Sequence, residues 1–248
     1  MTRSRGLGDV YKRQGGAAPN VVQSTATVRQ LIRASDNATL RELIPRVHDI
    51  AKGAALMTGT TVTTKVYSGV SNLVGNLPLE QAMQAEFDKL GPVPFEKEDE
   101  AFAEEIRKTL TTEDIAASFQ RAGRQTPPEL PLCDFVAPLD RPSHGGEGST
   151  DVGDVSWVTP TVQARVATCA VGTPFHTWQT VAQGKAPAAH KGMVHAAKVM
   201  AATATHLINS SETLKAARDV HDKRQQTTPY VCPIPPNTKP PVIDEPLS

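Results

Sequence analysis

Apolar and polar residues alternate along three segments, and this period of two residues is typical of β-strands. In residues 20–33 the apolar side chains fall on one parity, so we expect a half-buried strand there. Residues 60–67 (TTVTTKVY) are β-branched and alternating, and they predict a second strand. A third strand is expected at residues 162–171, closed by the Gly-Thr-Pro turn at 172–174.

Other segments carry apolar residues at the three- and four-residue spacing of amphipathic helices. The first begins at the N-cap candidates Asp36 and Asn37 and stops at Gly59. Because a proline inside a helix costs about 3 kcal/mol, Pro45 predicts a kink or a late start. Four more helices are expected at 78–90, 95–110, 188–207 and 212–225.

The order of these elements predicts an α/β protein. Residues 20–67 form a βαβ unit that is too small for a convincing domain, so they are interpreted as half of one. The helix at 188–207 is apolar except for a stripe through Lys191, His195 and Lys198, and we expect it to be mostly buried. Residues 123–148 are rich in proline and glycine and predict a long irregular segment, which is usually functional or mobile.

Composition excludes several classes of protein. The chain has 248 residues, 26 basic against 26 acidic side chains and 4% aromatic residues, which argues against a nucleic-acid-binding protein. It has no uninterrupted apolar stretch long enough for a transmembrane helix. The three cysteines are odd in number and contain no CxxC pair, so neither a disulfide framework nor a thiolate zinc site is indicated and a cytoplasmic location is expected.

The first fourteen residues differ in character from the rest. They carry four basic residues and no apolar core, which excludes a secretory signal. We expect residues 1–14 to be a non-native lead and leave them out of the fold prediction.

Among the histidines, His176 and His190 are candidates for chemistry. His176 follows a predicted strand and turn, with Trp178 beside it, and strand exits in α/β sheets are the usual place for sites. His190 stands at a helix N-terminus and could face a cleft. The others have no second ligand at metal-binding spacing and are expected to be structural: His48, His144, His195, His206 and His221.

Two acidic pairs differ in their setting. Asp151 and Asp154 lie between glycines just before the third predicted strand, where they could serve a site or could form turns and a helix N-cap. Glu104 and Glu105 lie on a charged amphipathic helix and predict a solvated face. No nucleophile elbow, P-loop or GxGxxG motif is present.

Three blocks resemble a known family. Residues 149–204 (STDVGDVSWVTPTVQARVATCAVGTPFHTWQTVAQGKAPAAHKGMVHAAKVMAATA), the block KGAALMTGTTV and the ending TTPYVCPIPPN are similar to members of the dinuclear-metal aminoacylase/carboxypeptidase family of amidohydrolases. The resemblance implies the C-terminal part of an α/β/α metallopeptidase-like catalytic domain and half of an α+β, ferredoxin-like lid that also forms a dimer. The implied boundaries are 15–74 for the lid and 75–248 for the catalytic part, with a subgroup insertion at 95–148 and a tail at 226–248.

The same resemblance implies roles for individual residues. His176 matches the family's last metal ligand. Asn20 and Arg33 match the lid asparagine and arginine that hold the substrate's carboxylate, a task suited to an amide donor and a guanidinium fork. Candidates for orienting roles around the metal are Asp151, Asp154 and His190.

The chain departs from the family in one respect. The family's other ligands (a histidine, a bridging aspartate and a Glu-Glu pair whose first member is the general base) are not found in this sequence. We therefore expect a C-terminal fragment, inactive alone, of an enzyme that uses two zinc or manganese ions on an N-acyl-glutamate type of substrate. The alternatives are a general N-acyl-amino-acid or dipeptide hydrolase, and a non-catalytic partner subunit. The expected assembly is a homodimer or a heterodimer with a related subunit, without nucleic acid or membrane.

Overall fold

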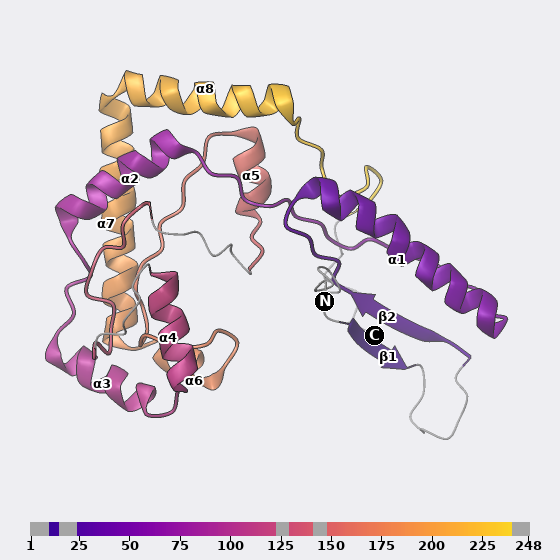
Figure 1. Ribbon diagram of the computed structural model, residues 1–248, viewed down its shortest axis with the longest axis horizontal. Coiled ribbons are helices and arrows are strands. Elements are labelled where there is room, and N and C mark those ends of the chain that lie inside the picture. Colours follow the sequence, from indigo (N-terminus) through magenta and orange to yellow (C-terminus); the bar gives the residue numbers. More distant parts are fainter. Residues whose placement is uncertain (1–9, 15–23, 123–128, 141–147, 240–248) are drawn as a thin grey trace. The chain divides into compact units, whose positions relative to one another are not determined.

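A computed structural model describes residues 10–14, 24–122, 129–140 and 148–239. The elements are drawn in Figure 1. They are, in chain order, β1 Val10–Gln14, β2 Ala26–Gln30, α1 Asn37–Thr58, α2 Leu77–Leu90, α3 Lys97–Arg107, α4 Thr112–Arg121, α5 Val152–Val158, α6 Trp178–Gln183, α7 Pro187–Asn209 and α8 Ser211–Thr227.

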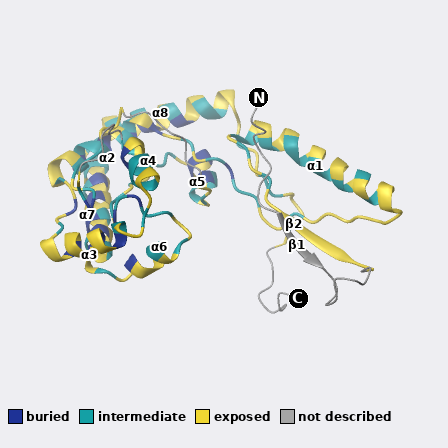
Figure 2. Cartoon of the chain, turned by 60° about the horizontal axis from the view of Figure 1, so that its bottom comes forward, coloured by how far each residue is buried: buried dark blue, intermediate teal, exposed yellow. Residues whose placement is uncertain are grey.

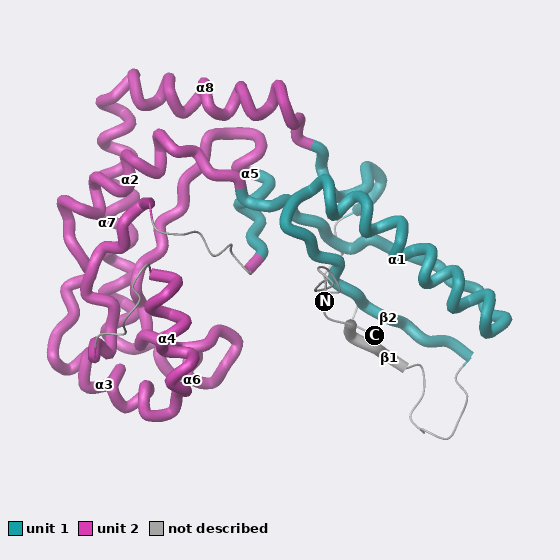
Figure 3. The backbone as a smooth tube through the Cα atoms, viewed as in Figure 1, with its two compact units in different colours: residues 1–73, 149–154, 231–248 teal, residues 74–148, 155–230 magenta. Residues whose placement is uncertain are grey.

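The chain divides into two compact units, coloured separately in Figure 3. Unit 1 contains residues 1–73, 149–154 and 231–248, and unit 2 contains residues 74–148 and 155–230. The assignment of these parts to a lid and a catalytic domain stays a prediction, as does the α/β fold class.

In unit 1, α1 has the ends expected from the sequence. The Asp36 carboxylate accepts a hydrogen bond from the backbone N–H of Thr39 at 2.9 Å, and Gly59 closes the helix with φ of +64°. The helix already begins at Asn37 and Pro45 lies inside it, so of the two outcomes expected at Pro45 the late start is wrong. None of the residues of α1, all of which the structure describes, is buried.

The strands of unit 1 differ from the prediction. β2 is shorter than expected and all five of its residues are exposed, so the half-buried strand is wrong. It pairs antiparallel with β1, in the register Lys12↔Val28, and β1 lies within the residues that were set aside as a lead. Residues 60–67 contain no strand. Alternation marks a segment that could pair, but a strand forms only where a partner supplies its backbone hydrogen bonds.

In unit 2, three helices make the main packing contacts. α2 packs against α7 and α8, and α7 also contacts α8. α2 begins with a proline in its first turn, as predicted. The amide of its N-cap residue Asn76 is buried and donates to the carbonyl of Ala217 on α8 at 2.9 Å. The helices predicted at 78–90, 95–110, 188–207 and 212–225 are all present, whereas α4, α5 and α6 were not predicted.

The long helix α7 is buried along one face only (Figure 2). The buried face contains Ala188, Gly192, His195, Val199 and Thr203. The prediction that this helix is mostly buried is wrong, because several large apolar residues elsewhere on it are exposed, among them Met193, Val194, Met200 and Ile208.

The strand predicted at 162–171 is also absent, since the structure has no strand pairing in this described segment. The segment instead passes close to α7: a Cβ placed at Gly192 would overlap the carbonyl oxygen of Ala167. Glycine at 192 therefore permits the close approach of an extended chain to the helix. This segment leads into the loop that carries His176.

Candidate functional site

One buried glutamine holds the loop that leads into α6. Gln183, the last residue of α6, is 3% exposed. Its Oε1 accepts a hydrogen bond from the backbone N–H of Ala170 at 2.7 Å, and its Nε2 donates to the Thr173 hydroxyl and the Gln179 carbonyl, both at 3.0 Å. A buried amide is stable only when its donors and acceptor are satisfied, so this side chain fixes the start of the loop against the helix.

Threonine hydroxyls fix the rest of the loop. The hydroxyls of Thr177 and Thr180 both donate to the carbonyl of Pro174 at 2.7 Å. Thr177 is also the N-cap of α6 and accepts a hydrogen bond from the backbone N–H of Thr180. The turn directly before His176 is therefore bonded to the residues directly after it.

His176 lies at the end of this loop in an unusual backbone conformation. Its φ is +64°, and within the described ranges no other residue except glycine has a positive φ. Such a conformation costs a non-glycine residue about 1–3 kcal/mol and persists only where the surroundings enforce it. Here the Gln183 and threonine hydrogen bonds enforce it. The side chain of His176 is exposed, so a rigid loop presents an imidazole to its surroundings.

His190, the second histidine candidate, lies in the first turn of α7 and is exposed. Its neighbour Lys191 is paired: its Nζ lies 2.8 Å from Glu96 and 2.5 Å from Asp99. Burial acts to raise the pKa of Asp99, but the hydrogen bonds from Lys191 and from the Glu96 backbone outweigh it and the pKa is lowered. The pKa of Lys191 is raised, first by its hydrogen bond to Asp99.

Asp154 and Asp151 have different surroundings in unit 1. The Asp154 carboxylate accepts hydrogen bonds from the backbone N–H of Ser71 at 3.0 Å and from its hydroxyl at 2.6 Å. Asp151 is exposed. These contacts tie the start of α5 to a distant part of the chain, which is neither the turn nor the N-cap role expected from the sequence. The orienting roles of Asp151 and Asp154 stay a prediction.

The two residues expected to hold a carboxylate belong to unit 1. Arg33 is exposed and follows β2, three residues before the N-cap of α1. Asn20 lies outside the described residues. His176 and His190 belong to unit 2.

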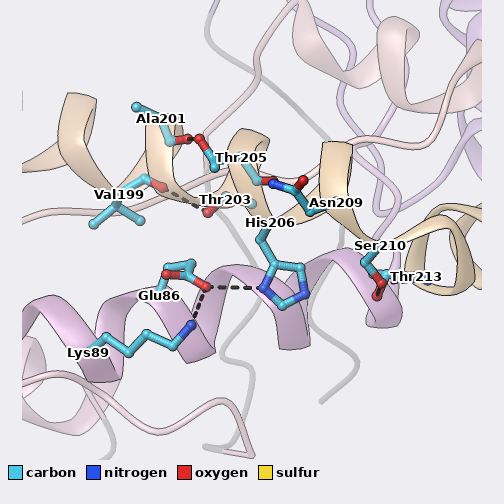
Figure 4. Close-up of polar contacts among 10 residues, drawn as sticks. All are labelled: Glu86, Lys89, Val199, Ala201, Thr203, Thr205, His206, Asn209, Ser210 and Thr213. Atoms are coloured by element: carbon cyan, nitrogen blue, oxygen red, sulfur yellow. Dashed lines mark hydrogen bonds and ion pairs between the residues drawn. The ribbon is translucent and has the colours of Figure 1, made fainter.

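Three further histidines have structural partners. His195 is buried and its Nε2 donates to the Gly91 carbonyl at 2.9 Å, while His221 Nε2 donates to the Trp157 carbonyl at 3.2 Å. Figure 4 shows the third, in which Nδ1 of His206 on α7 lies 3.1 Å from Oε1 of Glu86 on α2. Structural roles were expected for these histidines.

The contacts of Glu86 join two helices. Its carboxylate lies 2.7 Å from Nζ of Lys89 and also accepts the contact from His206. The hydrogen bond from Lys89, followed by that from His206, lowers the pKa of Glu86. This buried carboxylate therefore joins α2 to α7 through its hydrogen bond with His206, and it forms an ion pair with Lys89 within α2.

The described residues do not form a complete metal centre. An exposed imidazole suits a divalent metal such as zinc, and His176 provides one. Across the described part of the chain, however, no three His, Cys, Asp or Glu side chains come together in a group that could hold a metal ion. Burial raises the pKa of the Cys169 thiol. The residues present fit one ligand position and not a complete site.

Sequence reasoning missed Gln183. A single glutamine in a six-residue helix carries no spacing signal, and its role depends on a loop that folds back onto it. Only the Gly-Thr-Pro sequence at residues 172–174, just before His176, indicated a turn.

Comparison with known proteins supports the resemblance seen in the sequence. The chain is 42% identical over 236 aligned residues to a subunit of p-aminobenzoyl-glutamate hydrolase from Escherichia coli (strain K12). The alignment covers 91% of this chain, so the similarity to this hydrolase subunit extends far beyond residues 149–204. Membership of the dinuclear-metal family stays a prediction. The chain spans about half of that relative, 49% of its length.

Two other comparisons give no match. No protein-family profile matches the chain, and no solved structure matches it. Within the described residues, no helix combines the length and apolar character that crossing a membrane requires.

Proposed function

We propose that this chain is part of a metal-dependent amidohydrolase that cleaves the amide of p-aminobenzoyl-glutamate or a similar N-acyl amino acid. The observation that carries the proposal is the 42% identity, over 91% of the chain, to a protein named as a hydrolase of that substrate. Because the chain spans about half of that relative, the rest of the catalytic machinery is assigned to residues outside it.

His176 is proposed as one ligand of a centre that holds two zinc or manganese ions. Such ions polarise an amide carbonyl and generate hydroxide from bound water near neutral pH. The contribution of this chain is to hold the imidazole in place. The hydrogen bonds of Gln183 and the threonines support that role, because a ligand on a bonded loop needs little reorganisation when the metal binds.

Arg33 and Asn20 are proposed to hold the carboxylate of the substrate. A guanidinium forms paired, charge-assisted hydrogen bonds with a carboxylate, and an asparagine amide adds a neutral donor. The exposure of Arg33 supports this role, because its side chain is accessible to a small molecule.

The assembly is proposed to be a dimer, either of two copies or of this chain with a related subunit. The relative is named as one subunit of its enzyme, and that name favours a partner chain. The same name supports a second candidate function, in which this chain is a non-catalytic partner that contributes Asn20 and Arg33 to the site of another subunit. A cytoplasmic location is part of the proposal.

The test uses the longest open reading frame in the source DNA that contains these residues. The protein is expressed with manganese or zinc, and glutamate release is measured from p-aminobenzoyl-glutamate, other acyl-glutamates and acyl derivatives of alkyl amino acids. Preference for acyl-glutamates supports the proposal, and equal activity on alkyl amino acids favours a general hydrolase. A folded dimer that is loaded with metal and cleaves none of them contradicts both.

The role of His176 is tested by metal content. His176→Ala is expected to lower bound metal and activity together, whereas His48→Ala, on α1, leaves both unchanged. Unchanged metal and activity in His176→Ala would remove the ligand assignment and favour the non-catalytic partner.

A further inference from the structure

Two aromatic side chains flank His176 and are exposed. Phe175 precedes it and is 73% exposed, and Trp178, the first residue of α6, is 60% exposed. Large aromatic side chains bury 150–250 Å² when covered and favour stacking partners. Their exposure therefore leaves a strongly apolar surface at the position where the proposed function places the reaction.

The chain keeps the backbones of both aromatic residues close to the backbone of His176. Trp178 is two residues from His176, so their Cα atoms lie within about 7 Å of one another whatever the conformation. The hydrogen bonds of Thr177 and Thr180 to Pro174 hold this stretch in a single arrangement. The aromatic pair is therefore positioned by the same loop that positions His176.

We propose that Trp178, with Phe175 beside it, is the surface on which the aromatic acyl group of the amide substrate rests, and that it sets a preference for aryl over alkyl acyl groups. The inference rests on the proposed function. The acyl end of p-aminobenzoyl-glutamate, the substrate of the proposed function, is a flat aryl ring. A flat indole is complementary to such a ring, and stacking on it contributes beyond simple burial.

The first experiment measures binding without catalysis. The chain contains two tryptophans, of which Trp157 is 6% exposed and Trp178 is 60% exposed. In the ¹⁵N-labelled chain, addition of p-aminobenzoyl-glutamate is expected to shift the indole N–H signal of Trp178 through the ring current and to leave that of Trp157 in place. Trp178→Phe assigns the signals. No shift of the Trp178 signal at millimolar ligand overturns the inference.

The second experiment measures specificity in the active protein from the longest reading frame. Trp178→Ala is expected to lower kcat/KM for p-aminobenzoyl-glutamate roughly ten-fold and to change that for acetyl-glutamate less than about two-fold. Trp178→Phe should recover most of the loss because it keeps a ring. Met193→Ala, which removes a similarly exposed apolar side chain (61%) on α7, is the control. It should leave kcat/KM for both substrates unchanged.

The outcomes separate the two proposals. If Trp178→Ala lowers kcat/KM equally for both substrates, or for neither, the inference about the aryl surface is wrong while the proposed hydrolase function stands. A wild-type protein that cleaves neither substrate overturns the proposed function, and the binding experiment then decides whether Trp178 still binds an aryl amide. If Trp178→Ala instead abolishes the assembly of the protein, the surface is covered by another protein segment and the inference is wrong.

Discussion

The carboxylate of Asp154 binds Ser71 twice, through the backbone N–H at 3.0 Å and the hydroxyl at 2.6 Å. The two residues are 83 positions apart in sequence. A Cβ on the adjacent Gly153 would overlap the Ser71 carbonyl oxygen, so the two backbones also meet closely here. Asp154 thus joins two segments of unit 1 that lie far apart in the sequence.

Replacing Asp154 with Ala should destabilise unit 1. Hydrogen bonds to a charged group contribute about 1.5–3 kcal/mol each, so we expect Asp154→Ala to lower the free energy of unfolding by at least that amount. Urea unfolding followed by circular dichroism measures the change. Asp151→Ala is the control, because Asp151 is exposed and its loss should stay within about 0.5 kcal/mol. Equal effects of the two variants would contradict the structural role of Asp154.

Replacing Gln183 with Leu should loosen the loop that carries His176. The substitution leaves the backbone N–H of the buried residue Ala170 without its acceptor, which costs about 1–3 kcal/mol. We expect lower thermal stability and faster proteolytic cleavage between residues 170 and 178. Gln81→Leu, at an exposed position on α2, is the matched control and should leave the cleavage rate unchanged. A loop that is cleaved no faster in Gln183→Leu would show that other contacts hold it.

The ion pair between Asp99 and Lys191 should produce a pH-dependent stability. The pKa of Asp99 is lowered in the folded chain, so its contribution is present above the unfolded pKa of about 3.9 and is lost as pH falls through the folded value. The pKa of Lys191 is raised, so its contribution is present below about 10.4 and is lost as pH rises through its folded value.

Unfolding by urea at a series of pH values measures the loss of stability at acid pH and at alkaline pH. Asp99→Asn should lower stability near neutral pH and make the dependence shallower in the acid range and in the alkaline range. Lys52→Gln, which removes an exposed ion pair with Asp49, serves as the comparison. It should leave the pH dependence of the free energy of unfolding unchanged in both ranges. If Asp99→Asn loses stability at acid pH as steeply as the wild type, other carboxylates dominate that loss.

Two glycines in helices should respond oppositely to alanine. At Gly192 the new methyl group would overlap the Ala167 carbonyl, and overpacking of this kind costs about 1–3 kcal/mol. At Gly53 in α1 nothing lies within 4 Å of the added Cβ, so alanine should stabilise the helix by roughly 0.5–1 kcal/mol. Thermal melts of the two variants test this pair, and a stabilising Gly192→Ala would contradict the close approach of residue 167 to α7.

The sequence was a good guide to helices because their hydrogen bonds are local. Asp36 and Gly59 mark the two ends of α1, and the proline at the start of α2 is placed as predicted. The strands at 60–67 and 162–171 were wrong for the opposite reason. Alternation describes side chains, whereas pairing depends on a second strand far away in sequence.

The sequence indicated only those residues of the candidate site that stand in a recognisable local pattern. His176 stands out by its position after a turn, but its positive φ depends on Gln183, whose role arises from a loop folding back. The buried face of α7 was misjudged in the same way. Periodicity located the helix, but the buried side includes His195, which bonds the Gly91 carbonyl and had been placed on the polar stripe.

The fully unburied helix α1 has a consequence for local dynamics. Helices in proteins are stabilised mainly by packing of an apolar face, and α1 relies on its caps and its internal hydrogen bonds instead. Local opening is easiest where few apolar contacts must be broken. The backbone amides of α1 should therefore exchange with deuterium well before those on the buried face of α7, so this helix opens locally while α7 stays folded.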